Sequence, residues 1–307
     1  MNGFFNIDKP TGMSSAAVVG TMKRLTGERR VGHAGTLDPE AAGVLPVMMG
    51  RATRLFDYLV DKKKEYIAVC AFGRSTDTQD ATGETLETGE DYPDESRIRE
   101  ALPRLIGDIR QRPSMYSAIK VGGKPLYLRA RKGEQVQVPE RQVHVESIEL
   151  MNMEPENGAR LRIRCGKGTY IRSLCDDLGR LCGCPAHMRS LIRSQSGFFR
   201  LEDALGLEEA RELAAAGRLA ERLLPLDAPL SGMLRTEAPP ALGKAVAAGA
   251  RLPLNRLGGN LPGEGGVTRL YLGGRFWGIM ERRNDELIWR AQIPPEEKGE
   301  RKEERCD

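Results

Sequence analysis

Two periodicities of hydrophobic residues follow one another along this chain and predict both strands and helices. Residues 65–72 are rich in residues that favour strands, and at residues 160–165 arginines alternate strictly with apolar residues. Such alternation is typical of a strand with one buried face, so the three arginines are predicted to share an exposed, strongly basic face. Apolar residues then recur at helical spacing, at positions 171, 174, 175, 178, 181 and 182. The change of period puts Arg172 near the start of a helix that directly follows a strand, and unpaired backbone N–H groups make such a junction a natural anion site.

Further elements are expected on either side of this junction. Helical spacing predicts helices at residues 96–106 and 207–224, with Pro103 interrupting the first. The Val-Gly-Gly-Lys sequence at residues 121–124 predicts a turn, and residues 130–134 predict a mobile basic loop. The first two thirds of the chain therefore combine helices and strands, without an internal repeat.

The last part of the chain has a different pattern. Proline becomes frequent at residues 226–240, and beyond them Gly-Gly and Asn-Asp pairs separate short segments that read as strands. These segments are residues 267–272, 275–282 and 287–293. From Pro294 onward the chain is charged and lacks aromatic residues, which predicts disorder. The predicted division of the chain is a first domain at residues 1–230, a small β-domain at 231–295 and a disordered tail at 296–307.

Composition sets limits that do not depend on this pattern. The chain has 307 residues, six cysteines and a formal net charge of +4. It has no basic N-terminal region followed by an apolar stretch, and no run of about 18 apolar residues, so neither secretion nor membrane insertion is expected. We therefore expect a soluble protein of the reducing cytoplasm.

The positive charge is concentrated in two stretches. Residues 104–132 contain eight Lys or Arg residues and one acidic residue. Residues 160–200 contain nine Lys or Arg residues and two acidic residues. Runs of charge are often solvated faces with no partner. Two such stretches in one chain nevertheless favour contact with the phosphate backbone of a nucleic acid.

Several kinds of catalytic site lack support. Cys182 and Cys184 are separated by one residue, and no second pair with histidine has the spacing of zinc ligands, so we expect buried cysteines and no metal site. The Gly-Lys-Gly-Thr sequence at residues 166–169 lacks the upstream glycine and the Ser or Thr after lysine that a phosphate loop requires. Neither a G-x-S-x-G elbow nor a histidine partner for a serine hydrolase occurs. We therefore expect no cofactor.

A glycine-rich segment at residues 30–54 carries the strongest candidate for catalysis. Asp38 precedes Pro39 there, which disfavours a helical backbone and holds the aspartate in an extended or turning segment. Gly32, Gly35 and Gly43 would allow another backbone or a ligand to approach closely. Taken alone, an Asp-Pro pair more often forms an Asx turn or caps a helix.

The same segment resembles the signature of the TruB-type pseudouridine synthases. Residues 32–45 read G-H-A-G-T-L-D-P-E-A-A-G-V-L, which contains every element of that signature. Other blocks match in the order of the family, at residues 6–15, 64–66, 74–83, 113–120, 165–174 and 183–188. Collinear blocks over about two thirds of the chain are more specific than any single motif. The sequence departs from the family at Ala17, where an acidic residue is expected, and resembles it only loosely after Leu230.

The resemblance implies a fold and an activity. The fold is α+β, a pseudouridine synthase fold with a mixed, largely antiparallel sheet flanked by helices, a thumb-like RNA-binding insertion at about residues 112–140, and a PUA-like C-terminal β-domain. The activity is the isomerisation of uridine to pseudouridine at position 55 in the T-loop of tRNA, without metal or cofactor. The implied partner is tRNA, through its T-stem-loop. Neither DNA, a membrane nor an obligatory protein partner is expected, and the protein is expected to be a monomer.

The resemblance also assigns site residues. Asp38 corresponds to the catalytic aspartate, and it could attack C1′, attack the base, or remove a ribose proton to give a glycal. Arg172 would keep Asp38 ionised near RNA phosphates, Tyr66 would stack on the flipped base, and His33 would fill the gap left in the RNA. The remaining positions expected to line the pocket are Lys9, Asp80, Tyr170 and Leu191. Without the family match, each of these residues has an ordinary structural explanation as a turn, cap, surface or core residue.

Two other functions remain open at this point. One is a guide-RNA-dependent pseudouridine synthase that modifies other RNAs. The other is an RNA-binding or tRNA-folding chaperone, which would need the basic surface and no catalysis. A chaperone should tolerate Asp38→Asn, whereas an isomerase should lose its chemistry.

Overall fold

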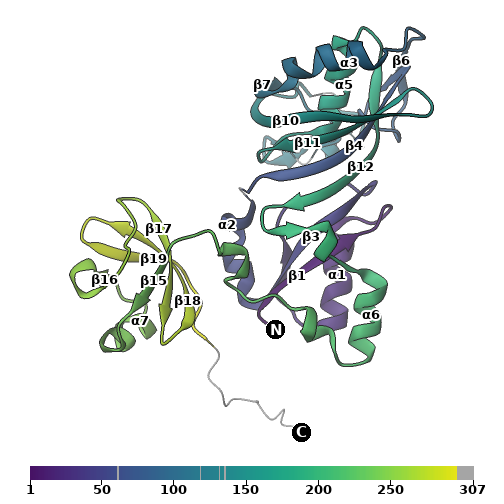
Figure 1. Cartoon of the computed structure of the whole chain (residues 1–307). Helices are drawn as coiled ribbons and strands as arrows, with labels where there is room; N and C mark the ends of the chain where they lie inside the picture. The colour runs from purple at the N-terminus through teal and green to yellow at the C-terminus, as the bar shows by residue number, and fades with distance from the viewer. Residues whose placement is uncertain (61, 118, 131, 135, 296–307) are drawn as a thin grey trace.

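The computed structural model describes residues 1–60, 62–117, 119–130, 132–134 and 136–295, and it contains two main sheets, one large and one small (Figure 1). The expected tail at 296–307 lies outside the described residues. No helix among the described residues is both long enough and apolar enough to span a bilayer.

The large sheet forms the body of the first part of the chain. In spatial order its main path is β14 (Leu205–Gly206), β1 (Gly3–Lys9), β3 (Ala41–Met49), β12 (Ala186–Ser196), β4 (Lys64–Phe72), β11 (Gly158–Cys165), β10 (Arg141–Glu154) and β7 (Gly107–Gln111). Two short strands pair beside this path, β2 (Val31–His33) with β3 and β13 (Phe199–Arg200) with β12. The β14–β1 and β3–β12 pairs are parallel and the other pairs are antiparallel. The expected mixed, largely antiparallel sheet is confirmed.

Helices cover the two ends of this sheet. Near β1 lie α1 (Ser15–Thr26) and α6 (Leu207–Ala215), which share an apolar core with β1 and β3. Near β4 and β11 lie α3 (Glu95–Ala101), continued by η2 (Leu102–Leu105), and α5 (Ile171–Leu181). The predicted strand-to-helix junction is confirmed, because β11 ends at Cys165 and α5 begins at Ile171 with its apolar face buried.

The predicted helix at residues 207–224 is wrong in its second half. Helix α6 ends at Ala215, and Gly217 follows with a φ of 70°, a left-handed conformation that favours glycine and ends helices. The chain then forms a separate short turn of 3₁₀ helix, η4 (Leu219–Arg222). The helical spacing of apolar residues continues beyond the turn at Gly217, but the α-helical backbone ends at Ala215.

The basic face predicted for residues 160–164 is neutralised in the fold. The three arginines do share one face of β11, while Leu161, Ile163 and Cys165 are buried on the other. Each guanidinium, however, pairs with a carboxylate on β10 or β4. The pairs are Arg160 with Glu154 at 2.6 Å, Arg162 with Glu149 at 2.8 Å and Arg164 with Glu65 at 2.8 Å. This face is therefore not a free surface for phosphates.

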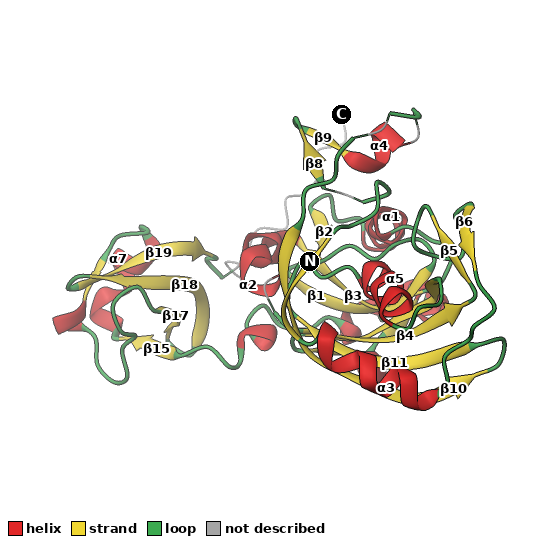
Figure 2. Ribbon diagram, turned by 90° about the horizontal axis from the view of Figure 1, so that it is seen from above, coloured by secondary structure: helices red, strands yellow, loops and turns green. Residues whose placement is uncertain are grey.

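The insertion after β7 projects from the body of the domain (Figure 2). It contains the short strands β8 (Lys120–Val121) and β9 (Lys124–Pro125) and the helix α4 (Leu126–Ala130). The predicted Gly122-Gly123 turn joins the two strands. Residue 131 of the predicted mobile loop lies outside the described residues.

The C-terminal strands form the second sheet. Its order is β15 (Arg235–Ala238), β17 (Val267–Leu272), β18 (Arg275–Arg283), β19 (Glu286–Gln292) and β16 (Leu252–Pro253), with α7 (Gly243–Ala247) beside it. The three strands predicted from sequence are confirmed within one residue. Helix α2 (Phe56–Val60), which follows η1 (Gly50–Leu55), lies between the two sheets (Figures 1 and 2). Ile279 and Ile293 of the C-terminal part share an apolar core with Leu59 of α2, so the two parts are packed together.

Candidate active site

Asp38 lies in the turn that leads from β2 into β3. Its carbonyl oxygen accepts a hydrogen bond from the Ala41 N–H at 3.1 Å, which closes the turn around Pro39. A strand follows this turn, so Asp38 does not cap a helix. Its half-exposed carboxylate faces Arg172 instead, with Oδ2 at 3.0 Å from Nε.

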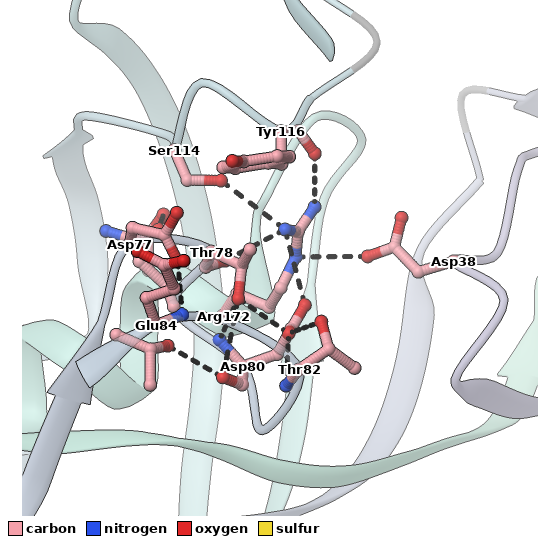
Figure 3. Close-up of polar contacts among 12 residues, drawn as sticks. Asp38, Asp77, Thr78, Asp80, Thr82, Glu84, Ser114, Tyr116 and Arg172 are labelled. Carbon is pink, nitrogen blue, oxygen red and sulfur yellow. Dashed lines mark hydrogen bonds and ion pairs between the residues drawn. The ribbon is translucent and has the colours of Figure 1, made fainter. Parts of the chain in front are cut away.

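Arg172 is a buried cation that collects groups from distant parts of the chain (Figure 3). The side chain extends from the start of α5 and is only 5% exposed. Besides Asp38, its guanidinium lies 3.5 Å from Asp80 Oδ2 and donates to the carbonyl oxygens of Thr78 at 2.9 Å and Tyr116 at 3.0 Å. Arg172 therefore joins the Asp38 turn, the Asp80 loop and the start of the projecting insertion.

Asp80 is held rigidly on the other side of Arg172. Its Oδ1 accepts hydrogen bonds from the Thr78 hydroxyl at 2.7 Å, the Thr82 hydroxyl at 2.6 Å and the Thr82 N–H at 3.0 Å. Between them Gln79 has a φ of 62°, and its side-chain carbonyl accepts from the Ser173 hydroxyl of α5 at 2.8 Å. The loop is thus fastened to the helix that carries Arg172.

A cavity of about 230 Å³ opens on one side of the Asp38–Arg172 pair. Four of the predicted pocket residues line it together with Arg172: Asp38, Tyr66, Tyr170 and Leu191. Tyr66, on β4, is 8% exposed, and burial raises the pKa of its hydroxyl. Burial also raises the pKa of Tyr170, whose backbone carbonyl accepts from the Gln111 amide at 3.1 Å. This cavity therefore has an aromatic wall, an aliphatic wall and one carboxylate.

A second cavity, of about 660 Å³, lies on the other side of the pair. Asp38 and Arg172 line both cavities, and His33 and Asp80 line the second. Burial and the positive charge of Arg193 lower the pKa of His33, although a hydrogen bond with the Gly35 backbone opposes them. His33 Nδ1 is buried and finds no hydrogen-bond partner among the described residues.

Lys9 was expected to line the pocket, but it lies beneath the Asp38 turn and lines neither cavity. The side chain is completely buried, and Nζ donates to the carbonyl oxygens of Met13 at 2.5 Å, Pro10 at 2.9 Å and Pro39 at 3.0 Å. Lys9 therefore ties the opening block at residues 6–15 to the turn that carries Asp38.

The burial of Lys9 predicts a pH dependence of stability. Burial lowers its pKa from 10.5 to about 8, against the opposing charges of Glu40 and Asp38. Between these pH values the unfolded chain binds the extra proton, so the free energy of unfolding should rise with pH for wild type relative to Lys9→Met. The expected difference is up to about 3 kcal/mol. Urea denaturation from pH 7.5 to 10.5 measures it, with the exposed Lys23→Met as control, and parallel curves for wild type and Lys9→Met would contradict the prediction.

Arg193 lines the first cavity, although sequence analysis gave it no role there. Arg193, on β12, is 1% exposed and donates to the carbonyl oxygens of Val44 at 2.7 Å, Gly35 at 3.0 Å and Thr36 at 3.4 Å. The signal was present, because Leu191 and Arg193 are two residues apart on a strand and so face the same side. In the sequence, however, Arg193 resembles an ordinary surface arginine.

The close approach expected at the glycines of the signature is found at Gly43. Strand β12 runs parallel to β3 here, with Arg193 opposite Gly43, whose φ is 99°. A Cβ at Gly43 would overlap the carbonyl oxygen of Arg193. The glycine thus allows the two strands to meet beside Asp38.

Gly43→Ala is therefore expected to destabilise the protein by about 3 kcal/mol, from backbone strain and overlap together. Gly217→Ala is a suitable control, because Gly217 also has a positive φ, of 70°, but an added Cβ would meet nothing within 4 Å. The control should lose only about 1 kcal/mol. Equal losses for the two variants in urea denaturation would show that overlap with Arg193 does not matter.

The described residues hold no group of three or more His, Cys, Asp or Glu side chains that could bind a metal ion. Cys182 and Cys184 are buried thiols, as expected.

The sequence and the fold have counterparts in known proteins. Two family models match, one described as "TruB family pseudouridylate synthase (N terminal domain)" over residues 23–171 and one as "tRNA pseudouridylate synthase B C-terminal domain" over residues 172–231. A protein named tRNA pseudouridine synthase B from Bacillus licheniformis is 42% identical over 257 residues, covering 82% of this chain and 83% of its own. One of the same name from Staphylococcus aureus (strain N315) is 45% identical over 239 residues, covering 76% and 78%.

Solved structures contain chains of similar fold. A crystal structure of a Cbf5-Nop10-Gar1 complex contains a chain that is 26% identical, with a TM-score of 0.71, covering 91% of this chain and 78% of that one. An H/ACA RNP bound to a substrate RNA containing 2′-deoxyuridine contains a chain at 22% identity with a TM-score of 0.73, covering 95% and 85%, and it supports the fold alone. By family model, sequence identity and fold, the chain belongs to the TruB family of pseudouridylate synthases.

Proposed function

We propose that this protein isomerises uridine to pseudouridine in the T-loop of tRNA, at position 55, with Asp38 as the catalytic carboxylate. One observation carries the proposal above the others. The Asp38 carboxylate is held 3.0 Å from the buried Arg172, at the wall of a cavity that Tyr66 and Leu191 also line. The relatives named tRNA pseudouridine synthase B support tRNA as the substrate.

The reaction suits a site with a single carboxylate. The bond between N1 and C1′ breaks, the base turns, C5 bonds to C1′, C5 loses a proton and N1 gains one, so no electrons are gained or lost. Asp38 could attack C1′, attack the base or remove a ribose proton, and each route requires the carboxylate to be ionised. Arg172 favours that form against the negative potential of bound RNA.

Flipping of the base would give roles to Tyr66 and His33, which line the cavities beside Asp38. A stacked uridine must leave the RNA loop before it can react, at a cost of a few kcal/mol. Tyr66 would recover part of this cost, since base–aromatic stacking contributes about 1–3 kcal/mol. His33, which lines the neighbouring cavity, would fill the space that the uridine leaves.

RNA binding would extend over three parts of the chain: the catalytic domain at residues 1–230, its insertion at about 112–140, and the PUA-like domain at 231–295. The stretch from residue 104 supports this, because four of its exposed cations form no ion pair within the described part of the chain. They are Arg104, Arg110, Lys124 and Lys132. The protein would act on tRNA as a monomer in the cytoplasm, without an obligatory protein partner.

The test is single-turnover conversion of a T-stem-loop transcript by the purified protein, with a chelator and without nucleotide or guide RNA. Pseudouridine at the expected position supports the proposal. Binding without conversion would favour a chaperone, and conversion only with an added guide RNA would favour a guide-dependent enzyme.

A further inference from the structure

Arg193 is a buried charge without a countercharge. Its side chain is 1% exposed and is the largest of the fully buried side chains that the structure describes. Within the described residues it forms no ion pair. Its guanidinium is satisfied by the three backbone carbonyls of Val44, Gly35 and Thr36 instead. Arg172, the other buried arginine of the cavity wall, lies between two carboxylates.

The carbonyls that Arg193 binds belong to the segment that carries Asp38. Gly35 and Thr36 lie immediately before Leu37 and Asp38, and Gly35 has a φ of 105°, which only a glycine adopts readily. Arg193 also lies directly opposite Tyr66 on the neighbouring strand β4. Burial raises the pKa of the Tyr66 hydroxyl, and the charge of Arg193 acts in the opposite direction. A single side chain therefore binds the backbone leading to the carboxylate and comes from the residue directly opposite the expected stacking ring.

Packing alone does not explain an arginine at this position. Removing a guanidinium from water has a large desolvation cost, so an arginine is an expensive way to fill space in a core. A methionine could fill the same space, although the carbonyls would lose their donors. The arginine therefore provides either directional hydrogen bonds or charge that the site uses.

We propose that Arg193 is a positioning residue for the isomerisation, whose hydrogen bonds fix the Gly35–Thr36 backbone ahead of Asp38 and whose uncompensated charge stabilises the detached base. This rests on the proposed function. When the bond from N1 to C1′ breaks, its electron pair remains on the base and spreads to O2 and O4. A fixed positive charge in the cavity wall lowers the energy of that anion until C5 bonds to C1′.

The kinetic test compares Arg193→Met and Arg193→Lys with the control Arg189→Met. Arg189 lies on the same strand, and it pairs at the surface with Glu156. Single-turnover rate, RNA affinity and melting temperature are measured for each. We expect Arg193→Met to slow conversion by about 10²- to 10³-fold without weaker binding. Its melting temperature should fall, because buried carbonyl oxygens lose their donor, so the rates are compared at a temperature at which every variant is folded. Arg193→Lys should recover part of the rate, and the control should match wild type.

The proposal would be overturned if the rate of Arg193→Met fell by less than about threefold from that of wild type. Removing one preorganised group from an active site slows catalysis far more than that. Rate losses that simply follow the melting temperatures would overturn it too. If Arg193→Met is too unstable to assay, Arg193→Gln replaces it, and equal rates for the Gln and Lys variants would then exclude the charge. An inactive wild type would instead refute the proposed function.

A second test does not depend on activity. Burial lowers the pKa of His33 and of His187. The charge of Arg193 lowers that of His33 further, and the charges of Arg74 and, least of all, Arg189 lower that of His187. Titration of His33 and His187 by NMR should therefore show a raised pKa for His33 in Arg193→Met, whereas Arg189→Met should leave His33 unchanged and move His187 only slightly. An unchanged His33 in Arg193→Met would mean that the charge does not reach the site.

Discussion

Asp38→Asn is expected to bind the T-stem-loop RNA like wild type and to convert uridine at least about 10⁴-fold more slowly. The amide has the shape of the carboxylate, and its oxygen can still accept the hydrogen bond from Arg172 Nε, 3.0 Å away in wild type. The cavity and its surroundings should therefore persist. The amide is neither a nucleophile nor a base, so each of the three routes open to Asp38 is blocked.

The measurement is single-turnover conversion at enzyme concentrations that saturate the RNA, together with a separate binding titration. Asp57→Asn makes the same change at an exposed residue of α2 and should leave both quantities unaltered. Conversion by Asp38→Asn at close to the wild-type rate would remove Asp38 from the chemistry. Equal loss of binding and conversion would show instead that the carboxylate serves mainly to hold the fold or the RNA.

Arg172→Met is expected to have two large effects. It should slow conversion by about 10³-fold, because a fixed electrostatic partner of the reacting group is lost. It should also lower the free energy of unfolding by about 3–5 kcal/mol, because Asp80 and the carbonyl oxygens of Thr78 and Tyr116 lose a buried partner. Arg172→Lys keeps the charge but cannot reach these groups together, so it should recover only part of either quantity.

Urea denaturation and single-turnover kinetics measure the two effects. Arg99→Met is the control. It removes an exposed ion pair on α3, in which the Arg99 guanidinium lies 2.7 Å from the Glu95 carboxylate, and it should change the free energy of unfolding by less than about 1 kcal/mol. A stability loss in Arg172→Met as small as that of this control would contradict a structural role for the cluster. Since Arg172 also holds the Tyr116 carbonyl, the variant should be cut faster by trypsin at Arg129 in the insertion.

The sequence predicted the elements that depend on local pattern. Alternation at residues 160–165 and helical spacing from residue 171 identified β11 and α5, and hence the position of Arg172 at a helix start. The Asp-Pro turn and the close approach at Gly43 followed from backbone preferences alone. Local pattern was enough wherever neighbours in sequence determine the conformation.

The errors arose where distant segments meet. The arginines of β11 are neutralised by acids of β10 and β4, which the spacing within β11 cannot reveal. Lys9 is turned away from the cavity by carbonyls up to 30 residues away. Arg193 is buried because its strand pairs with Gly43, some 150 residues earlier in the chain, and such a pairing has no signal in a single sequence.

The position of β12 in the large sheet has a consequence for synthesis of the protein. The strand is the last long one of that sheet to be translated, yet it lies between β3 and β4 and joins the two halves. Until it leaves the ribosome, β4 and the first residues of β3 present unpaired edges to the crowded cell, and such edges invite aggregation. Folding of this domain must therefore wait for nearly its full length, and chaperones that shield nascent chains should raise the yield of native enzyme.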